Sequence, residues 1–136
     1  MQDPAQRKPL TEVIRQGELS QSDCPSREVF RHVCSLWGVL CLISLRDGTH
    51  RFSDLRRKAG GVSEKMLAQT LKQLEGDGFV LRRALPVVPP HVEYSLTPLG
   101  REVADQIAGL ADWIEVNLFR VMEARQRRSP VATEPA

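Results

Sequence analysis

The chain has 136 residues, of which 41% are hydrophobic and 26% are charged. This length supports one domain with its own core, and the balanced composition excludes a largely disordered chain and a membrane protein. The net charge of +2 is unevenly spread, because nine Lys/Arg and five Asp/Glu lie between Arg46 and Arg83. That stretch carries +4, which favours a nucleic-acid partner, although a solvated helical face gives the same count.

Cysteine usage and apolar runs indicate the compartment. Three cysteines without paired spacing argue against a disulfide framework and a Cys-X-X-Cys zinc site, so a reducing cytosol fits. Residues 1–9 contain no apolar stretch typical of a signal peptide. The longest apolar run, residues 36–45, is shorter than the roughly 20 residues that cross a membrane. We therefore expect a cytoplasmic protein.

Polarity divides the chain into one domain and two tails. Residues 1–23 are rich in Gln, Arg, Asp and Ser, which predicts a flexible arm that orders only on dimerisation or binding. Residues 125–136 contain two prolines and predict a disordered tail. The domain itself is expected to span 24–124.

Two apolar segments begin the domain. A first helix is predicted with Ser26 as its N-cap, because apolar residues recur at helical spacing beyond it. Its apolar positions are Val29, Phe30, Val33, Cys34 and Trp37. Residues 36–45 are apolar nearly all round, which predicts a second helix buried at the centre of the domain. Cys34 and Cys41 are expected to fill the core.

A helix-turn-helix pattern follows. Residues 52–59 predict a short helix with a basic outer face, and Gly60-Gly61 predicts a sharp turn. Ser63 is then the expected N-cap of an amphipathic helix that ends at 76–78. At 100° per residue, this helix turns polar residues away from its apolar side, with no acid on the midline. These outward residues are Lys65, Gln69 and Lys72.

The last third of the chain predicts a hairpin and a long helix. Residues 79–83 and 92–96 are β-type segments joined by a loop with three prolines. Thr97 and Pro98 are the expected N-cap and first residue of the helix. Its apolar stripe lasts about three heptads, so we expect a second copy of the chain to cover it, the alternative being its own domain. The stripe comprises Leu99, Val103, Ile107, Leu110, Ile114, Leu118 and Val121.

This order of elements predicts a mostly α-helical winged helix-turn-helix with a small β-hairpin, in which the second helix of the motif enters the major groove of DNA. Several strings also resemble the HxlR-type family of bacterial transcriptional regulators over residues 24–118. They are Cys24-Pro25, Trp37, RFSDL at 51–55, VSEKMLAQTL at 62–71, Leu74-Glu75, VPPHVEYSLT at 88–97 and Gly100. One departure is Cys34-Ser35-Leu36, where family members typically have Gly-Gly-Lys.

The resemblance implies a homodimeric regulator, usually a repressor, that binds a pseudo-palindromic operator in double-stranded DNA. Dimerisation through the first and last helices would use Val29, Phe30, Val33, Leu99, Val103, Ile107, Leu110, Ile114 and Leu118. The recognition helix would present Ser63, Lys65, Met66, Gln69 and Lys72 to the DNA. The wing would span 85–91 and include His91. We expect the phosphate contacts from Arg56, Arg57, Lys58 and Arg83.

Cys24 is a candidate redox-sensing residue, because several relatives sense quinones, aldehydes or disulfide stress through a cysteine at this position. A helix N-terminus and Arg27 nearby would favour its thiolate. Our hypothesis is that modification of Cys24 releases DNA. The alternative is an ordinary, partly buried cysteine.

No other group of residues in the sequence predicts a metal, catalytic or cofactor site. His32, His50 and His91 have neither metal-ligand spacing nor an evident carboxylate partner, so no metal site is expected. Glu75 and Asp77 are interpreted as the end of a helix. No nucleophile-base set, phosphate-binding loop or cofactor motif is present in the sequence, so we expect neither an enzyme nor a cofactor. The alternative function is a winged-helix module for dimerisation or protein interaction without specific DNA binding.

Overall fold

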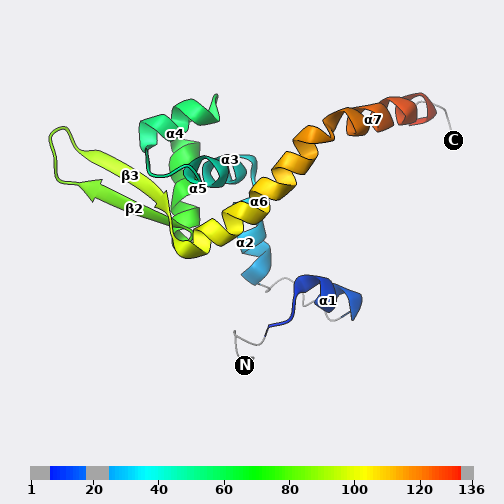
Figure 1. Ribbon diagram of the computed structural model, residues 1–136, viewed down its shortest axis with the longest axis horizontal. Coiled ribbons are helices and arrows are strands. Elements are labelled where there is room, and N and C mark those ends of the chain that lie inside the picture. The colour runs from blue at the N-terminus through cyan, green and yellow to red at the C-terminus, as the bar shows by residue number, and fades with distance from the viewer. Residues whose placement is uncertain (1–6, 18–24, 133–136) are drawn as a thin grey trace.

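The computed structural model describes residues 7–17 and 25–132, which form seven helices and a three-stranded antiparallel sheet (Figure 1). The first elements are α1 (Leu10–Arg15), α2 (Pro25–Cys34), α3 (Leu36–Leu45), β1 (His50–Arg51) and α4 (Phe52–Ala59). They are followed by α5 (Glu64–Gly76), β2 (Val80–Leu85), β3 (His91–Leu96), α6 (Pro98–Val116) and α7 (Leu118–Ala132). The β2–β3 hairpin projects from one side of a compact body, and α6 with α7 extends from the other.

Helix α3 is the centre of this body, as the all-round apolar pattern predicts. The Ser35 hydroxyl caps it by accepting a hydrogen bond from the Gly38 amide at 3.1 Å. Leu42 and Leu45 are fully buried, because α2, α4, α5, α6 and β3 all pack around this helix. The buried cluster comprises Val33, Cys41, Leu42, Leu45, Leu55, Val62, Leu67, Leu71, Leu74, Phe79, Val80, Tyr94, Ala104 and Ile107.

The predicted hairpin is confirmed and has a third strand. β2 pairs with β3 from Val80 opposite Leu96 to Leu85 opposite His91. β1 pairs with the other edge of β3, with His50 opposite Tyr94. The prediction of a two-stranded wing was therefore incomplete, because a two-residue strand is too short to show alternation and forms only where another strand offers an edge.

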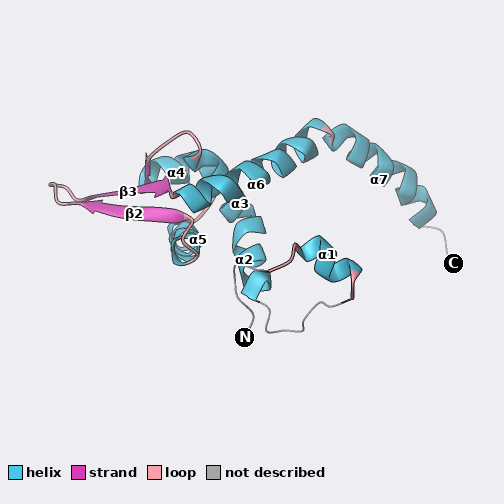
Figure 2. Cartoon of the chain, turned by 60° about the horizontal axis from the view of Figure 1, so that its bottom comes forward, coloured by secondary structure: helices cyan, strands magenta, loops and turns pink. Residues whose placement is uncertain are grey.

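The long C-terminal helix predicted as one piece is broken at Asn117, where α6 ends and α7 begins. The Asn117 side-chain amide donates to the Trp113 carbonyl at 2.8 Å, and its oxygen accepts from Arg120 at 2.9 Å. Such side-chain bonds compete with the helical backbone ladder. Figure 2 shows the change of direction at this point.

Both predicted tails contain a helix. α1 lies within residues 1–23, and α7 continues to Ala132, where the composition predicted disorder from 125. Residues 123–128 are good helix formers, and Glu123 pairs with Arg127 one turn later at 3.9 Å. The domain boundaries at 24 and 124 stay predictions. Ser26 lies inside α2 rather than at its N-cap, because Pro25 occupies the first helical turn.

No single helix in residues 7–17 and 25–132 is both long and apolar enough to cross a membrane. The pair α2 and α3 meets that test by length and composition when taken together, but the two are bent by 72° at Ser35.

Candidate nucleic-acid interface

Helices α4 and α5 form a helix-turn-helix on the surface of the core. Leu55 of α4 and Leu67, Leu71 and Leu74 of α5 are buried on their inner sides. The turn between the helices passes through two glycines with positive φ at positions 60 and 61, as the sequence predicts. The motif is therefore held by apolar contacts on one side, which leaves the other side free for a ligand.

Ser63 is the N-cap of α5, which confirms its predicted structural role. Its side-chain oxygen accepts a hydrogen bond from the Met66 amide at 3.1 Å. Lys65, Gln69 and Lys72 are exposed, and Met66 is exposed beside them. The outer face of α5 is thus polar and basic, as helical geometry predicts, and its contacts with DNA stay a prediction.

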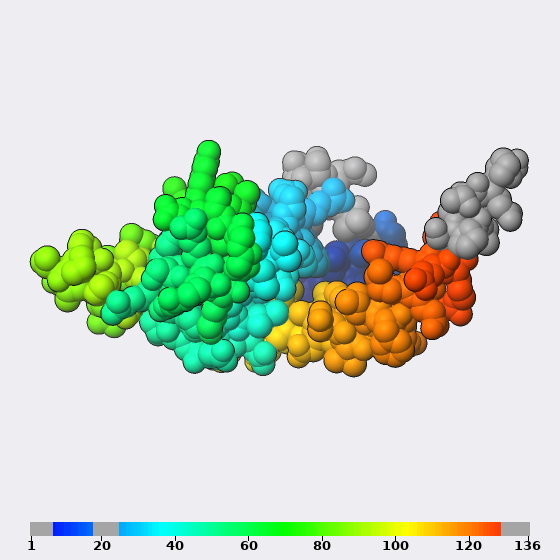
Figure 3. All heavy atoms as spheres, turned by 90° about the horizontal axis from the view of Figure 1, so that it is seen from above, coloured from blue at the N-terminus to red at the C-terminus, as the bar shows by residue number. Residues whose placement is uncertain are grey.

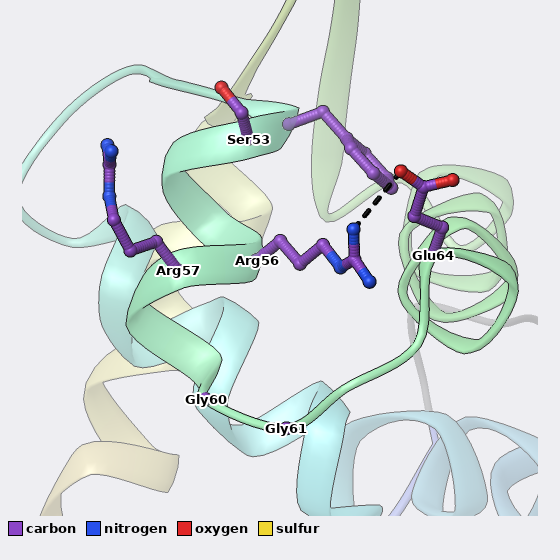
Figure 4. A pocket seen from close by; sticks show the side chains of 7 residues that line it. Ser53, Arg56, Arg57, Gly60, Gly61 and Glu64 are labelled. Atoms are coloured by element: carbon purple, nitrogen blue, oxygen red, sulfur yellow. Dashed lines mark hydrogen bonds and ion pairs between the residues drawn. The ribbon is translucent and has the colours of Figure 1, made fainter.

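Arg56 reaches from α4 to the beginning of α5. Its Nη1 atom lies 3.1 Å from Glu64 Oε1, and its Nε donates to the Val62 carbonyl at 3.3 Å. Figure 4 shows these two side chains pointing toward each other across an open recess of about 440 Å³. The recess is lined by Phe52, Ser53, Arg56, Arg57, Gly60, Gly61 and Glu64. Glu64 was missed at the sequence level because it lies off the basic midline.

The other basic residues of α4 also have acidic or imidazole partners. Arg57 pairs with Asp54 one turn earlier. The Lys58 ammonium lies 3.7 Å from the Asp47 carboxylate and 2.9 Å from His50 Nε2. Exposed pairs of this kind contribute only about 0–1 kcal/mol to stability. To contact phosphates as predicted, these α4 side chains would have to leave their present partners, and breaking such exposed pairs costs little free energy.

The wing presents its charges along the hairpin. Arg83 is exposed on β2 and lies opposite Glu93 in the ladder. His91 is half-buried at the start of β3, and the residues of the tip, 86–90, are all exposed. The strand register thus places Arg83 and His91 on the projecting part of the molecule, and their nucleic-acid contacts stay a prediction.

Helices α2 and α6 carry the residues predicted for dimerisation, except Leu118, which begins α7. Val33 and Ile107 are buried within the single chain, and Val29 and Val103 are half-buried. The remaining predicted residues are exposed, namely Phe30, Leu99, Leu110, Ile114 and Leu118. A recess of about 390 Å³ between the two helices is lined by Ser26, Val29, Phe30, Val33, Cys34, Val103, Gln106 and Ile107. Cys34 is exposed in this recess, so its prediction as core filler was wrong, whereas Cys41 is buried as expected.

The exposed apolar surface continues beyond the predicted set. We define the apolar arm as the second half of α6 with α7, and in Figure 3 it extends away from the compact body. Its large exposed apolar residues are Leu110, Trp113, Ile114, Val116, Leu118, Phe119 and Met122. Trp113 is interpreted from the sequence as a core or interface anchor, and it is exposed here; Val116, Phe119 and Met122 were missed because the stripe followed one apolar residue per turn and they flank it.

One prediction about histidine was wrong. His32 has a carboxylate partner, because its Nδ1 atom lies 2.6 Å from Asp77 Oδ2. The two residues are 45 positions apart, so no local spacing could reveal the pair. Asp77 is the C-cap of α5, which agrees with its interpretation as a helix end. Among the described residues, no group of three His, Cys, Asp or Glu side chains is arranged to hold a metal ion.

The α3–α4–α5 unit with the β2–β3 hairpin defines a winged helix-turn-helix protein. The family model described as HxlR-like helix-turn-helix matches residues 32–122, and the chain belongs to that family. This confirms the resemblance drawn from the sequence motifs. The chain is therefore a DNA-binding transcriptional regulator by fold and family.

Three similar proteins illustrate the relationship. The uncharacterized HTH-type transcriptional regulator YtfH of Escherichia coli K12 is 63% identical over 120 residues, which cover 88% of this chain and 95% of YtfH. The structure of the transcriptional regulator ytfH from Salmonella typhimurium aligns with a TM-score of 0.75 and 70% identity, over 76% of this chain and 93% of that one. The structure of the redox regulator HypR in its oxidized form aligns with a TM-score of 0.63 and 34% identity. The alignment covers 69% of this chain and 97% of HypR.

Proposed function

We propose that this regulator represses transcription by binding a pseudo-palindromic operator as a homodimer, with α5 of each protomer in the major groove. The observation that carries the proposal is the exposed face of α5, where Lys65, Gln69 and Lys72 form a midline without an acidic residue. Lysine suits phosphates or guanine edges, and glutamine pairs with adenine. A capped helix packed on a rigid core presents these groups in a fixed geometry.

The charges around α5 support the same orientation. Arg56, Arg57 and Lys58 lie on the neighbouring helix, and Arg83 lies on the wing. Phosphate contacts from such residues fix the register of a protein on the duplex, and base contacts supply its sequence preference. We therefore propose that these four residues supply most of the affinity for DNA and that the exposed residues of α5 supply the preference for particular bases.

The homodimer is supported by the uncovered apolar surfaces of α2 and the apolar arm. Contiguous exposed apolar patches on a protein mark interaction sites. A second copy would bury them and place two recognition helices about one turn of DNA apart, roughly 34 Å. The operator would then contain two inverted half-sites.

Selection of binding sites from random duplexes by the purified protein tests this proposal. We expect an inverted repeat to emerge, with affinity that falls steeply as salt is raised. Lys65→Ala should weaken binding to the selected operator by about 1–3 kcal/mol and leave random DNA almost unaffected. Arg128→Ala is the matched control, because it removes one exposed positive charge from α7. Equal losses on operator and random DNA would exclude a base-reading role for Lys65, and a flat salt response would favour the protein-interaction module.

We also propose that oxidation regulates this binding through Cys24, which lies outside the described residues. Similarity to the redox regulator HypR supports the proposal. Diamide should release the wild-type protein from its operator and leave Cys24→Ser bound. Cys34→Ser and Cys41→Ser are the controls, and they should respond as the wild type does. A normal diamide response in Cys24→Ser would contradict the role of Cys24.

A further inference from the structure

We propose that His32 and Asp77 act as positioning residues, which fix the recognition helix relative to the dimer surface and so set the spacing between half-sites. This inference rests on the proposed function. The contact joins the last turn of α2 to the C-cap of α5, with His32 Nδ1 and Asp77 Oδ2 2.6 Å apart. The two side chains are only 14% and 17% exposed, so water competes little for either group.

On the α2 side, the backbone of His32 is fixed against the core. The Ser35 hydroxyl donates to the His32 carbonyl at 3.1 Å while it caps α3. A Cβ atom at Gly38 would lie 2.1 Å from that carbonyl oxygen, so only glycine permits this approach of α3 to α2. His32 is therefore anchored at the corner between the predicted dimer helix and the central core helix.

On the other side, the chain just after α5 is tied to the start of α6. The Thr97 hydroxyl donates to the Gly78 carbonyl at 2.6 Å and accepts from the Gly100 amide at 2.9 Å. The Thr97 amide donates to the Phe79 carbonyl at 3.0 Å. A Cβ atom at Gly100 would lie 1.9 Å from the Phe79 oxygen, so the backbones are in direct contact. The C-terminal end of α5 is thus held between α2 and α6.

Because α5 is anchored at its C-terminal end, a small tilt at that end produces a larger displacement at its N-terminal end. Its 13 residues span about 20 Å, so a tilt of roughly 10° about the Asp77 end would move its N-terminal end by about 3 Å. One base pair advances about 3.4 Å along DNA. Loss of the contact between His32 and Asp77 removes the tie to α2 and leaves only the core leucines and the tie to α6, so tilts up to this size become easier and the preference for a single half-site spacing relaxes.

The test compares binding to the selected operator with binding to versions whose half-sites are one base pair closer or farther apart. The wild-type protein should prefer its own spacing by about tenfold or more, a difference of the size that a mismatched base pair causes. His32→Phe keeps an aromatic ring but removes the nitrogen that bonds to Asp77. It should reduce the preference for the operator's own spacing to about twofold. His32→Asn keeps a donor near the Nδ1 position and should retain the wild-type ratio.

Asp77→Ala removes the contact from the other side and should give the same loss, so the test does not depend on the folding of one variant. The double variant should lose no more than either single one, because both remove the same contact. A merely structural role would lower affinity for all three spacings alike, and that result, or an unchanged ratio in the variants, would overturn the positioning role alone. Failure of the wild-type protein to select any duplex with two half-sites would overturn the proposed function and this inference together.

Discussion

The two halves of α6 have the same apolar periodicity and opposite surroundings. From Ala104 to the midpoint, Ala104, Ile107 and Ala108 are at most 8% exposed, because α3 lies against this part of the helix, whereas Leu99 at the helix start is 51% exposed. In the second half, Leu110, Trp113 and Ile114 are 45–56% exposed. Periodicity therefore identifies which side of a helix is apolar, and the length of the covering helix decides how much of that side the protomer buries.

The largest expected effect comes from the matched isoleucines of these halves. Ile107→Ala should lower the free energy of unfolding by about 2–5 kcal/mol, since it leaves a cavity beside the core. Ile114→Ala should lower it by less than about 0.5 kcal/mol, since this side chain is exposed in the protomer. Urea denaturation, at concentrations where sedimentation shows a monomer, measures both values. Equal losses would show that a neighbouring segment covers both halves of α6 within one chain.

The second half of α6 should instead determine association. Leu110→Glu combined with Ile114→Glu should raise the dimer dissociation constant about 100-fold or more, because burial of each apolar side chain contributes roughly 1.5–3 kcal/mol. Sedimentation equilibrium measures the constant, and circular dichroism should show unchanged helix content. Arg101→Glu changes an exposed residue of α6 outside the predicted dimer surface and should leave association intact. A double variant that still dimerises would mean that another surface forms the interface.

A smaller effect, on affinity for DNA, is expected at the start of α5. Glu64→Gln frees Arg56 and removes a negative charge beside the expected phosphates, so affinity for random duplexes at low salt should rise about twofold to fivefold. Fluorescence anisotropy at two salt concentrations measures the change. Glu123→Gln is the control, because it breaks the similarly exposed pair with Arg127 in the apolar arm. A fall in affinity would instead indicate that Glu64 orients Arg56 for its phosphate contact.

The rate at which each cysteine reacts shows whether its surroundings are covered, and this measurement needs no destabilising substitution in the core. Burial raises the pKa of the Cys41 thiol from 9.0 to about 12, so this thiol should resist iodoacetamide at pH 8 until the protein unfolds. Cys34 should react slowly in the dimer and faster in the monomeric Leu110→Glu, Ile114→Glu variant. Mass spectrometry in a Cys24→Ser background measures both rates. Equal Cys34 rates in dimer and monomer would place the interface away from the recess between α2 and α6.

The raised pKa of Cys41 also has a consequence for stability. The folded chain holds this proton more tightly than the unfolded chain, so the associated stability is complete below pH 9 and is lost as pH rises toward 12. Cys41→Ala should therefore lose less of its unfolding free energy between pH 9 and 11 than the wild-type protein does. Parallel pH profiles for the two proteins would contradict this assignment.

The sequence by itself determined the order and type of the elements from α2 to α6 except β1, together with the cap at Ser63 and the exposed face of α5. These features depend on interactions between residues close in the chain, such as capping, turn formation and helical periodicity. The same local reasoning found the family motifs, because they are contiguous strings. It also located most of the apolar stripe of α6.

Only the tertiary structure decided which parts of that stripe are covered, where β1 joins the sheet and how α5 is anchored. Cys34 and Cys41 both lie on apolar helical faces, yet one is exposed and the other is buried, because other helices surround α3 and leave part of α2 open. The contact between His32 and Asp77 joins residues 45 positions apart. Their distance depends on how α2, α3 and α5 pack, which no spacing within the sequence specifies.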